Sequence, residues 1–121
     1  MSSLKVTSEF EKAVAKLEDA AKRPKDEFLR DSTIQRFEFS VELAWKTAKR
    51  VMGTSAQAPK DVIREMAQAG YIHDPAPWLE AIDMRNLTSH TYKEELAERV
   101  YTFAIGFLPE LKALVQFLNK K

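Results

Sequence analysis

The sequence predicts an all-α protein, a single-domain antiparallel helical bundle of about five helices with a four-helix-bundle core. Helix-forming residues dominate the chain, and alternation of apolar and polar residues at a period of two is almost absent. With 121 residues, 45% of them hydrophobic, the chain can bury one core and leaves little room for a second. Because no internal repeat and no long polar linker divides it, we expect residues 1–121 to form one domain.

The first two predicted helices have recognisable ends. An S-x-x-E capping box opens with Ser8, so the first helix is expected to begin there and to end near Pro24. The second begins after Asp26, or alternatively at Ser32, and ends at Gly53, a residue type suited to the position after a helix. Their apolar stripes predict the buried residues, which are Phe10, Val14, Leu17 and Ala21, and then Ile34, Phe37, Val41, Ala44, Trp45, Ala48 and Met52.

Three further helices follow. The third is expected between Pro59, in its first turn, and Gly70. The fourth follows Asp74, where two prolines are compatible only with a first helical turn. The fifth is expected to begin at Thr91, in a second capping box, and to reach the C-terminus with a kink at Pro109. The predicted buried residues are Val62, Ile63, Met66, Trp78, Leu79, Ile82, Leu96, Val100, Phe103, Phe107, Leu111, Leu114 and Leu118.

Composition excludes several classes of protein. Nineteen basic and eighteen acidic residues give a net charge of +1, so any phosphate binding must be local. The absence of cysteine excludes disulfides and cysteine nucleophiles and favours an intracellular protein. No apolar run approaches the roughly 20 residues that span a bilayer, and the start lacks a signal-peptide core, so we expect a cytoplasmic protein without membrane contact. Motifs for metal and nucleotide binding are also missing, so we expect no metal and no cofactor.

The second predicted helix carries a second apolar face. Phe39 and Leu43 fall nearly opposite its buried stripe, on the side that a monomeric bundle normally keeps polar. Either another helix of the bundle covers them or they form a homodimer contact, and the pattern alone leaves both open. Glu38 and Glu42 edge the same helix, where we expect them to pair with Lys46 or with a basic residue of a neighbouring helix.

A polar cluster lies between the fourth and fifth predicted helices. Arg85, Asn86, Ser89 and His90 flank the apolar line of the fourth helix, and they precede the start of the next. Buried arginine and histidine are costly, so the cluster is expected to line a cleft or an interface, where an arginine can grip a phosphate and a histidine can exchange a proton. The alternative is that both residues cap carbonyls or pair with a carboxylate. The chain's other histidine, His73, is expected on a surface turn.

These residues resemble a known signature. Arg85-x4-His90-x-Tyr92 is similar to the R-x4-6-H-x-Y motif of HEPN domains, with a polar residue after the arginine. Together with residues 34–46 and 61–65, the motif resembles the HepT-like subfamily, often called nucleotidyltransferase substrate-binding subunits. The resemblance covers nearly all 121 residues.

The resemblance implies a homodimer that works with a separately encoded minimal nucleotidyltransferase in a toxin and antitoxin relationship. Arg85 and His90 of two protomers would form one cleft for metal-independent RNA cleavage, with Asn86 and Ser89 as substrate contacts. Tyr92 resembles the tyrosine that partner nucleotidyltransferases adenylylate in some relatives. The resemblance also makes the homodimer the favoured explanation of the second apolar face. The alternatives are a non-catalytic adaptor that presents substrate to the nucleotidyltransferase, and a plain helical dimerisation module.

Overall fold

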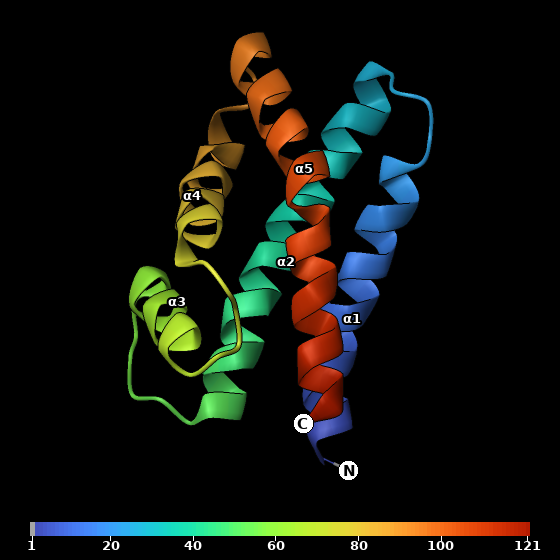
Figure 1. Cartoon of the computed structure of the whole chain (residues 1–121). Helices are drawn as coiled ribbons and strands as arrows, with labels where there is room; N and C mark the ends of the chain where they lie inside the picture. The colour runs from blue at the N-terminus through green and yellow to red at the C-terminus, as the bar shows by residue number, and fades with distance from the viewer. Residues whose placement is uncertain (1) are drawn as a thin grey trace.

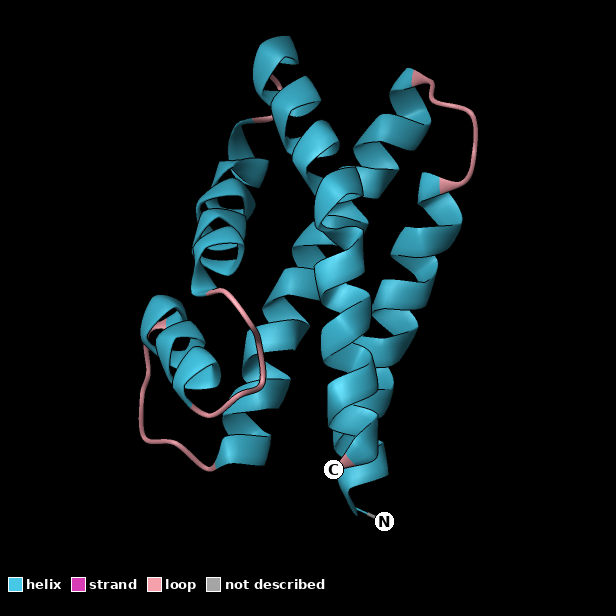
Figure 2. Ribbon diagram, in the orientation of Figure 1, coloured by secondary structure: helices cyan, strands magenta, loops and turns pink. Residues whose placement is uncertain are grey.

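Three long helices lie along one another, and two shorter helices cover one side of them (Figure 1). The computed structural model describes the backbone of residues 2–121 and the side chains of residues 7–121. Its elements are α1 (Ser2–Ala21), α2 (Glu27–Met52), α3 (Pro59–Gln68), α4 (Pro75–Asn86), the short 3-10 helix η1 (Leu87–His90) and α5 (Glu94–Lys120). Figure 2 shows helices joined by short loops, and no strand occurs in residues 2–121. The predicted all-α class is therefore confirmed.

The topology is a four-helix bundle with one added helix. In Figure 1, α1 and α4 run towards one end of the molecule, and α2 and α5 run back towards the other. The short α3 lies beside the end of α2 and below the start of α4 (Figure 1). Both chain termini lie at the same end of the bundle, and the junction between α4 and α5 lies at the opposite end. The junction is the segment that holds the predicted motif.

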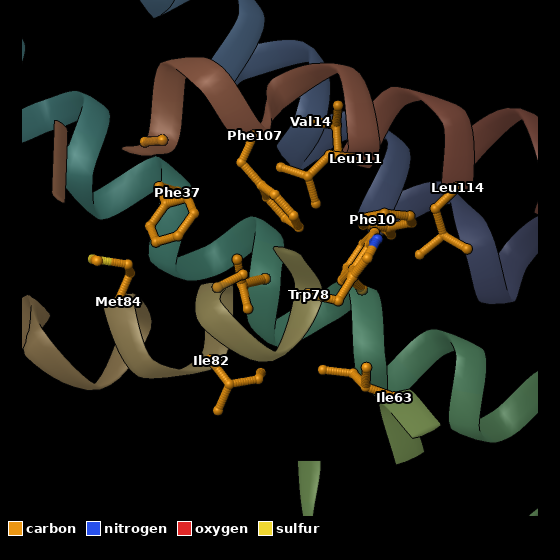
Figure 3. Close-up of a cluster of buried hydrophobic side chains, with 14 of the residues drawn as sticks. Phe10, Val14, Phe37, Ile63, Trp78, Ile82, Met84, Phe107, Leu111 and Leu114 are labelled. Atoms are coloured by element: carbon orange, nitrogen blue, oxygen red, sulfur yellow. The ribbon is translucent and has the colours of Figure 1, made fainter. Parts of the chain in front are cut away.

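The core is a cluster of aromatic and aliphatic side chains between α2, α4 and α5, with α1 closing the remaining side (Figure 3). Trp78 is fully buried, and its ring meets that of Phe107 edge to face, with 4.8 Å between the centroids. Phe37 makes similar contacts with Phe103 and Phe107, at 5.9 and 6.4 Å. Most predicted core residues are buried; those that are only half-buried are Ala21, Trp45, Met52, Leu79, Leu96 and Phe103.

Three predicted helix ends agree with the structure. The carboxylate of Asp26 accepts a hydrogen bond from the Leu29 amide at 2.7 Å and caps α2, so the alternative start at Ser32 is not used. Gly53 ends the same helix in the left-handed conformation, at φ 67°. Asp74 caps α4 in the same way as Asp26, through a hydrogen bond from the amide of the second helical residue at 3.0 Å. In each case a short polar or flexible residue satisfies groups that the helix itself leaves open.

Both predicted capping boxes are wrong. Helix α1 begins at Ser2, so Ser8 lies inside it, where the preceding residues already continue the helix. Thr91 does not start α5 either, because the chain first forms η1 and enters α5 only at Glu94. The Thr91 hydroxyl donates a hydrogen bond to the Thr88 carbonyl at 3.1 Å and so stabilises that tight turn. A capping sequence shows which residue could cap a helix, and the path of the neighbouring backbone decides whether it does.

Helix α5 is unbroken at Pro109, although proline removes one backbone donor there. In Figure 1, α5 changes direction between its upper, orange part and its lower, red part. Neither α5 nor any other helix within residues 2–121 combines the length and apolar character that a bilayer crossing needs.

A cluster of charges joins the beginning of α2 to the beginning of α5. Arg30 is 6% exposed and donates hydrogen bonds to Glu94, to Glu98 at 3.0 Å and to Asp31 at 3.1 Å. Its bonds to Glu94, and then to Glu98, raise the pKa of the Arg30 guanidinium above its ordinary value. Lys25 first, and Arg30 second, lower the pKa of the Glu98 carboxyl. This cluster fixes the start of α5, immediately after the predicted motif.

Candidate functional site

The residues predicted for catalysis, substrate contact and modification lie in one short stretch at the top of the bundle in Figure 1, between the brown end of α4 and the orange start of α5. Arg85 and Asn86 end α4, Ser89 and His90 belong to η1, and Tyr92 lies in the turn that follows. The chain contracts here into a 3-10 turn because the Thr88 hydroxyl donates to the Arg85 carbonyl at 2.8 Å. A local hydrogen bond therefore helps to hold the motif in a compact connection between α4 and α5.

Arg85 is the anchored member of the motif. Its side chain is 34% exposed, and Nη2 donates to Oε2 of Glu42, on α2, at 2.8 Å. Nη1 makes a long contact of 3.4 Å with Oδ1 of Asn86, and the buried Nε has no hydrogen-bond partner. The other oxygen of Glu42, Oε1, accepts from Nζ of Lys46 at 3.1 Å. The sequence predicted that Glu42 pairs with Lys46 or with a basic residue of a neighbouring helix. In the structure Glu42 pairs both with Lys46 and with Arg85 of α4.

His90 and Tyr92 are free of such anchors. Both side chains are exposed, Tyr92 to 79%, and their rings meet edge to face with 6.2 Å between centroids. Within residues 7–121 the His90 imidazole has no hydrogen-bond or ion-pair partner. The alternative, in which the motif residues cap carbonyls or pair with a carboxylate, holds for Arg85, whereas the His90 side chain does neither within residues 7–121. An exposed, unpaired imidazole can take up or release a proton at a bound molecule.

Asn86 and Ser89, the predicted substrate contacts, belong to the same segment as Arg85 and His90. Asn86 and Ser89 are exposed, and Asn86 touches Arg85 as described. Within residues 7–121 the hydrogen bonds and ion pairs of the Arg85 side chain go to Asn86 and Glu42 and not to His90. His73 is exposed on a separate turn, as expected.

The start of α5 carries acidic residues next to the motif. The helix begins at Glu94, with Glu94 and Glu95 in its first turn, and Lys93 at the cap position makes no side-chain cap bond. Carboxylates at a helix N-terminus satisfy the positive end of its dipole and repel a phosphate.

Phe39 and Leu43 lie on the outward side of α2, next to α1. They line a shallow pocket of about 300 Å³ whose rim includes Lys12, Lys16 and Arg36. Leu43 is half-buried against the core, whereas Phe39 remains 52% exposed. Helix α1 lines the same pocket and so covers this face in part, and it leaves about half of the Phe39 side chain exposed.

This chain is similar in sequence to a known protein family and to a named relative. Residues 5–120 match a family described as "Nucleotidyltransferase substrate binding protein like". The Haemophilus influenzae protein named "Probable ribonuclease HepT" is 38% identical over an alignment of 96 residues. The match covers 73% of this chain and 66% of that relative, slightly under two thirds of its length.

Two solved structures share the fold. A Thermus thermophilus protein superposes with a TM-score of 0.75 at 32% identity, covering 92% of this chain and 96% of its own. A Haemophilus influenzae protein, described as revealing the fold of a substrate binding domain of a nucleotidyltransferase, superposes with a TM-score of 0.72 at 33% identity and covers 95% of both chains.

Proposed function

Because this chain belongs to the nucleotidyltransferase substrate binding protein like family, we propose that it is the helical partner subunit of a minimal nucleotidyltransferase encoded as a separate chain. We propose further that the pair acts as toxin and antitoxin and that this subunit is a metal-independent endoribonuclease. The name of the Haemophilus relative supports the ribonuclease assignment. The observation that carries it is the exposed and unpaired His90, one short turn away from a half-exposed Arg85.

The proposed reaction uses these two residues without a metal. The 2′-hydroxyl oxygen of RNA bonds to the adjacent phosphorus while the bond from phosphorus to the 5′-oxygen breaks. One His90 accepts the proton of the 2′-hydroxyl, and His90 of the second protomer donates a proton to the departing 5′-oxygen. Arg85 stabilises the extra negative charge on the phosphoryl oxygens, and Asn86 and Ser89 contact the RNA chain. The products are a 2′,3′-cyclic phosphate and a 5′-hydroxyl end.

A homodimer would complete this site. Phe39 is exposed, and Glu42, which holds Arg85, lies three residues later on the same helix and therefore on an adjacent part of its surface. A two-fold contact through Phe39 and Leu43 would bring the Arg85 sites of two chains towards the same axis. We expect light scattering to give the mass of a dimer and Phe39→Asp to reduce it to that of a monomer. Phe28→Asp, which changes an 88% exposed residue of the same helix, is the matched control.

The ribonuclease assignment is tested with purified protein, an RNA oligonucleotide and EDTA. We expect cleavage that leaves a 2′,3′-cyclic phosphate, and we expect His90→Ala and Arg85→Ala to abolish it while circular dichroism stays unchanged. His73→Ala, which removes the other exposed histidine, should keep full activity. Unchanged cleavage in both motif variants would exclude the roles proposed for them.

Tyr92 is the proposed site of modification by the nucleotidyltransferase. It is 79% exposed, and its ring touches that of His90, so an attached AMP would place negative charge and bulk beside the proposed proton-transfer group. Incubation with the cognate nucleotidyltransferase, ATP and magnesium should add one AMP, detected by mass spectrometry, and should stop RNA cleavage. Transfer that persists in Tyr92→Phe would place the acceptor elsewhere.

The second candidate function is a non-catalytic adaptor that presents substrate to the nucleotidyltransferase. Two observations favour it: Glu42 partly neutralises Arg85, and α5 begins with two carboxylates next to the motif. An adaptor would leave RNA intact even when purified away from its partner, and it would still bind the nucleotidyltransferase. Cleavage by the isolated protein, lost in His90→Ala, separates the two functions.

A further inference from the structure

We propose that Glu42 is a positioning residue for Arg85, which it holds in the orientation needed for RNA cleavage while it weakens RNA binding. This inference rests on the proposed ribonuclease function. It starts from a chain of three charged groups on two helices. Oε2 of Glu42 accepts from Nη2 of Arg85 at 2.8 Å, and Oε1 of Glu42 accepts from Nζ of Lys46 at 3.1 Å.

The carboxylate is itself held in place. Its side chain is 26% exposed, and each of its two oxygens is engaged by a different cation. Glu42 and Lys46 are four residues apart on α2, in the order that favours pairing on a helix. The long helix α2 therefore presents a fixed acceptor to the end of α4, where Arg85 lies.

Glu42 restrains Arg85 without using up its donors. Nη2 of the guanidinium is bound to Glu42, and Nε is buried without a hydrogen-bond partner. The bond and the burial together confine the guanidinium to the space between α2 and α4. The remaining contact, from Nη1 to Asn86, is long at 3.4 Å and lies at the exposed surface. Nη1 can consequently donate to a phosphate while Nη2 stays with Glu42.

The same carboxylate changes the local charge. Arg85, Lys46 and Glu42 together carry a net charge of +1, whereas without the carboxylate they carry +2. Removing it should strengthen attraction of the RNA backbone, because phosphate binding follows local positive charge. Removing it should also release the guanidinium from its fixed orientation, which slows a reaction that depends on positioning. Binding and turnover are thus expected to move in opposite directions.

The test is Glu42→Gln, which keeps the shape of the side chain and removes its charge. We expect RNA to bind about threefold more tightly at low salt, with a salt dependence steeper by about one unit, and kcat to fall about tenfold or more. Glu42→Asp, which keeps the charge but shortens the reach, should restore the affinity and leave kcat low. Glu38→Gln is the matched control, because Glu38 lies one turn earlier on α2 and forms no ion pair within residues 7–121.

Three outcomes would overturn the inference. If Glu42→Gln raises both affinity and kcat, Glu42 merely competes with phosphate. If neither changes, it has no role in the site. If the variant loses both, with a lowered melting temperature, its role is structural.

A measurement without RNA separates this inference from the proposed function. In the wild type, the NMR signal of the Arg85 Nε–H group should show a rigid side chain, and in Glu42→Gln it should show fast motion. Wild-type protein that does not cut RNA would refute the ribonuclease, while this signal and the salt dependence of RNA binding would still decide whether Glu42 restrains Arg85. An Nε–H signal that is equally rigid in both proteins would refute the restraint.

Discussion

Replacing Arg30 with methionine tests how the start of α5, and with it the motif, is held against α2. The substitution removes the charge and keeps a long, flexible side chain in a place where the native one is 8% exposed. It deletes the hydrogen bonds to Asp31, Glu94 and Glu98. We expect the folded protein to lose stability, because the charge-assisted bonds to Glu94 and Glu98 join the start of α2 to the start of α5.

The magnitude follows from the exposure of the partners. Breaking a fully buried ion pair costs about 3–5 kcal/mol, largely because a charge stays behind without water. Here the remaining carboxylates, Glu94 at 67% and Glu98 at 43% exposure, can regain hydration. Methionine also avoids the cost of burying a guanidinium. We therefore expect Arg30→Met to lower the free energy of unfolding by about 1–2 kcal/mol at pH 7, which is a fall in Tm of about 3–8 °C.

The difference in stability between the wild type and Arg30→Met should depend on pH through the Glu98 carboxyl. Lys25 and Arg30 lower the pKa of the folded Glu98 carboxyl below the value of 4.5 expected for a free glutamate. Stability from such a group is fully present above pH 4.5 and is lost as the pH falls through the lowered folded value. The stability difference between wild type and Arg30→Met should therefore be constant from pH 7 down to about pH 5 and shrink below pH 4.5.

Urea unfolding followed by circular dichroism, at several pH values, measures that difference. Arg64→Met is the control, because Arg64 is 56% exposed and its ion-pair partner among residues 7–121 is a surface aspartate, so its loss should leave the unfolding midpoint unchanged. Equal midpoints for wild type and Arg30→Met at pH 7 would contradict the reasoning. So would a difference that stays the same at pH 3.

Three further predictions concern single interactions. Phe37→Ala leaves a cavity in the fully buried aromatic cluster and should lower the free energy of unfolding, measured by chemical denaturation, by about 3–5 kcal/mol. Phe28→Ala, at an 88% exposed site, should leave that free energy almost unchanged. Equal effects of the two substitutions would contradict the assigned core. Gly53→Ala forces a side chain into a backbone at φ 67° and should destabilise by about 1–2 kcal/mol, so a thermal melt identical to wild type would refute the left-handed cap. Hydrogen bonding from Lys112 lowers the pKa of the Glu18 carboxyl, so an NMR titration of Lys112→Met should give a higher pKa for Glu18 than in the wild type. An unchanged pKa would show that the two side chains do not pair in solution.

Sequence patterns predicted the helices well because each helix depends on interactions between residues that are close together in the sequence. Asp26, Gly53 and Asp74 end helices through local hydrogen bonds or local backbone geometry, and these signals survive folding. Ser8 and Thr91 failed because their capping signals say nothing about whether the chain before them is already helical or coiled into a 3-10 turn. Helix existence was therefore easier to predict than helix starts.

The site was predictable to the extent that it is contiguous in sequence. The motif from Arg85 to Tyr92 occupies one connection, so its pattern could be recognised without a fold. The link from Arg85 to Glu42 depends on how α4 packs against α2, which no local pattern fixes. The available signal was a pair of acidic residues at the edge of an apolar stripe. It predicted Lys46 as one partner and did not identify Arg85 as the basic residue on the neighbouring helix. The exposure of Phe39 likewise required the positions of the other helices.

The two chain termini lie together at the end of the bundle farthest from the α4–α5 junction. Affinity tags or fluorescent proteins joined at either end would consequently emerge away from Arg85 and His90. The same arrangement allows a donor dye at one terminus and an acceptor on labelled RNA to report how far a bound strand lies from the base of the bundle. Immobilisation through a terminus would leave the motif facing the solution, which suits surface measurements of RNA or nucleotidyltransferase binding.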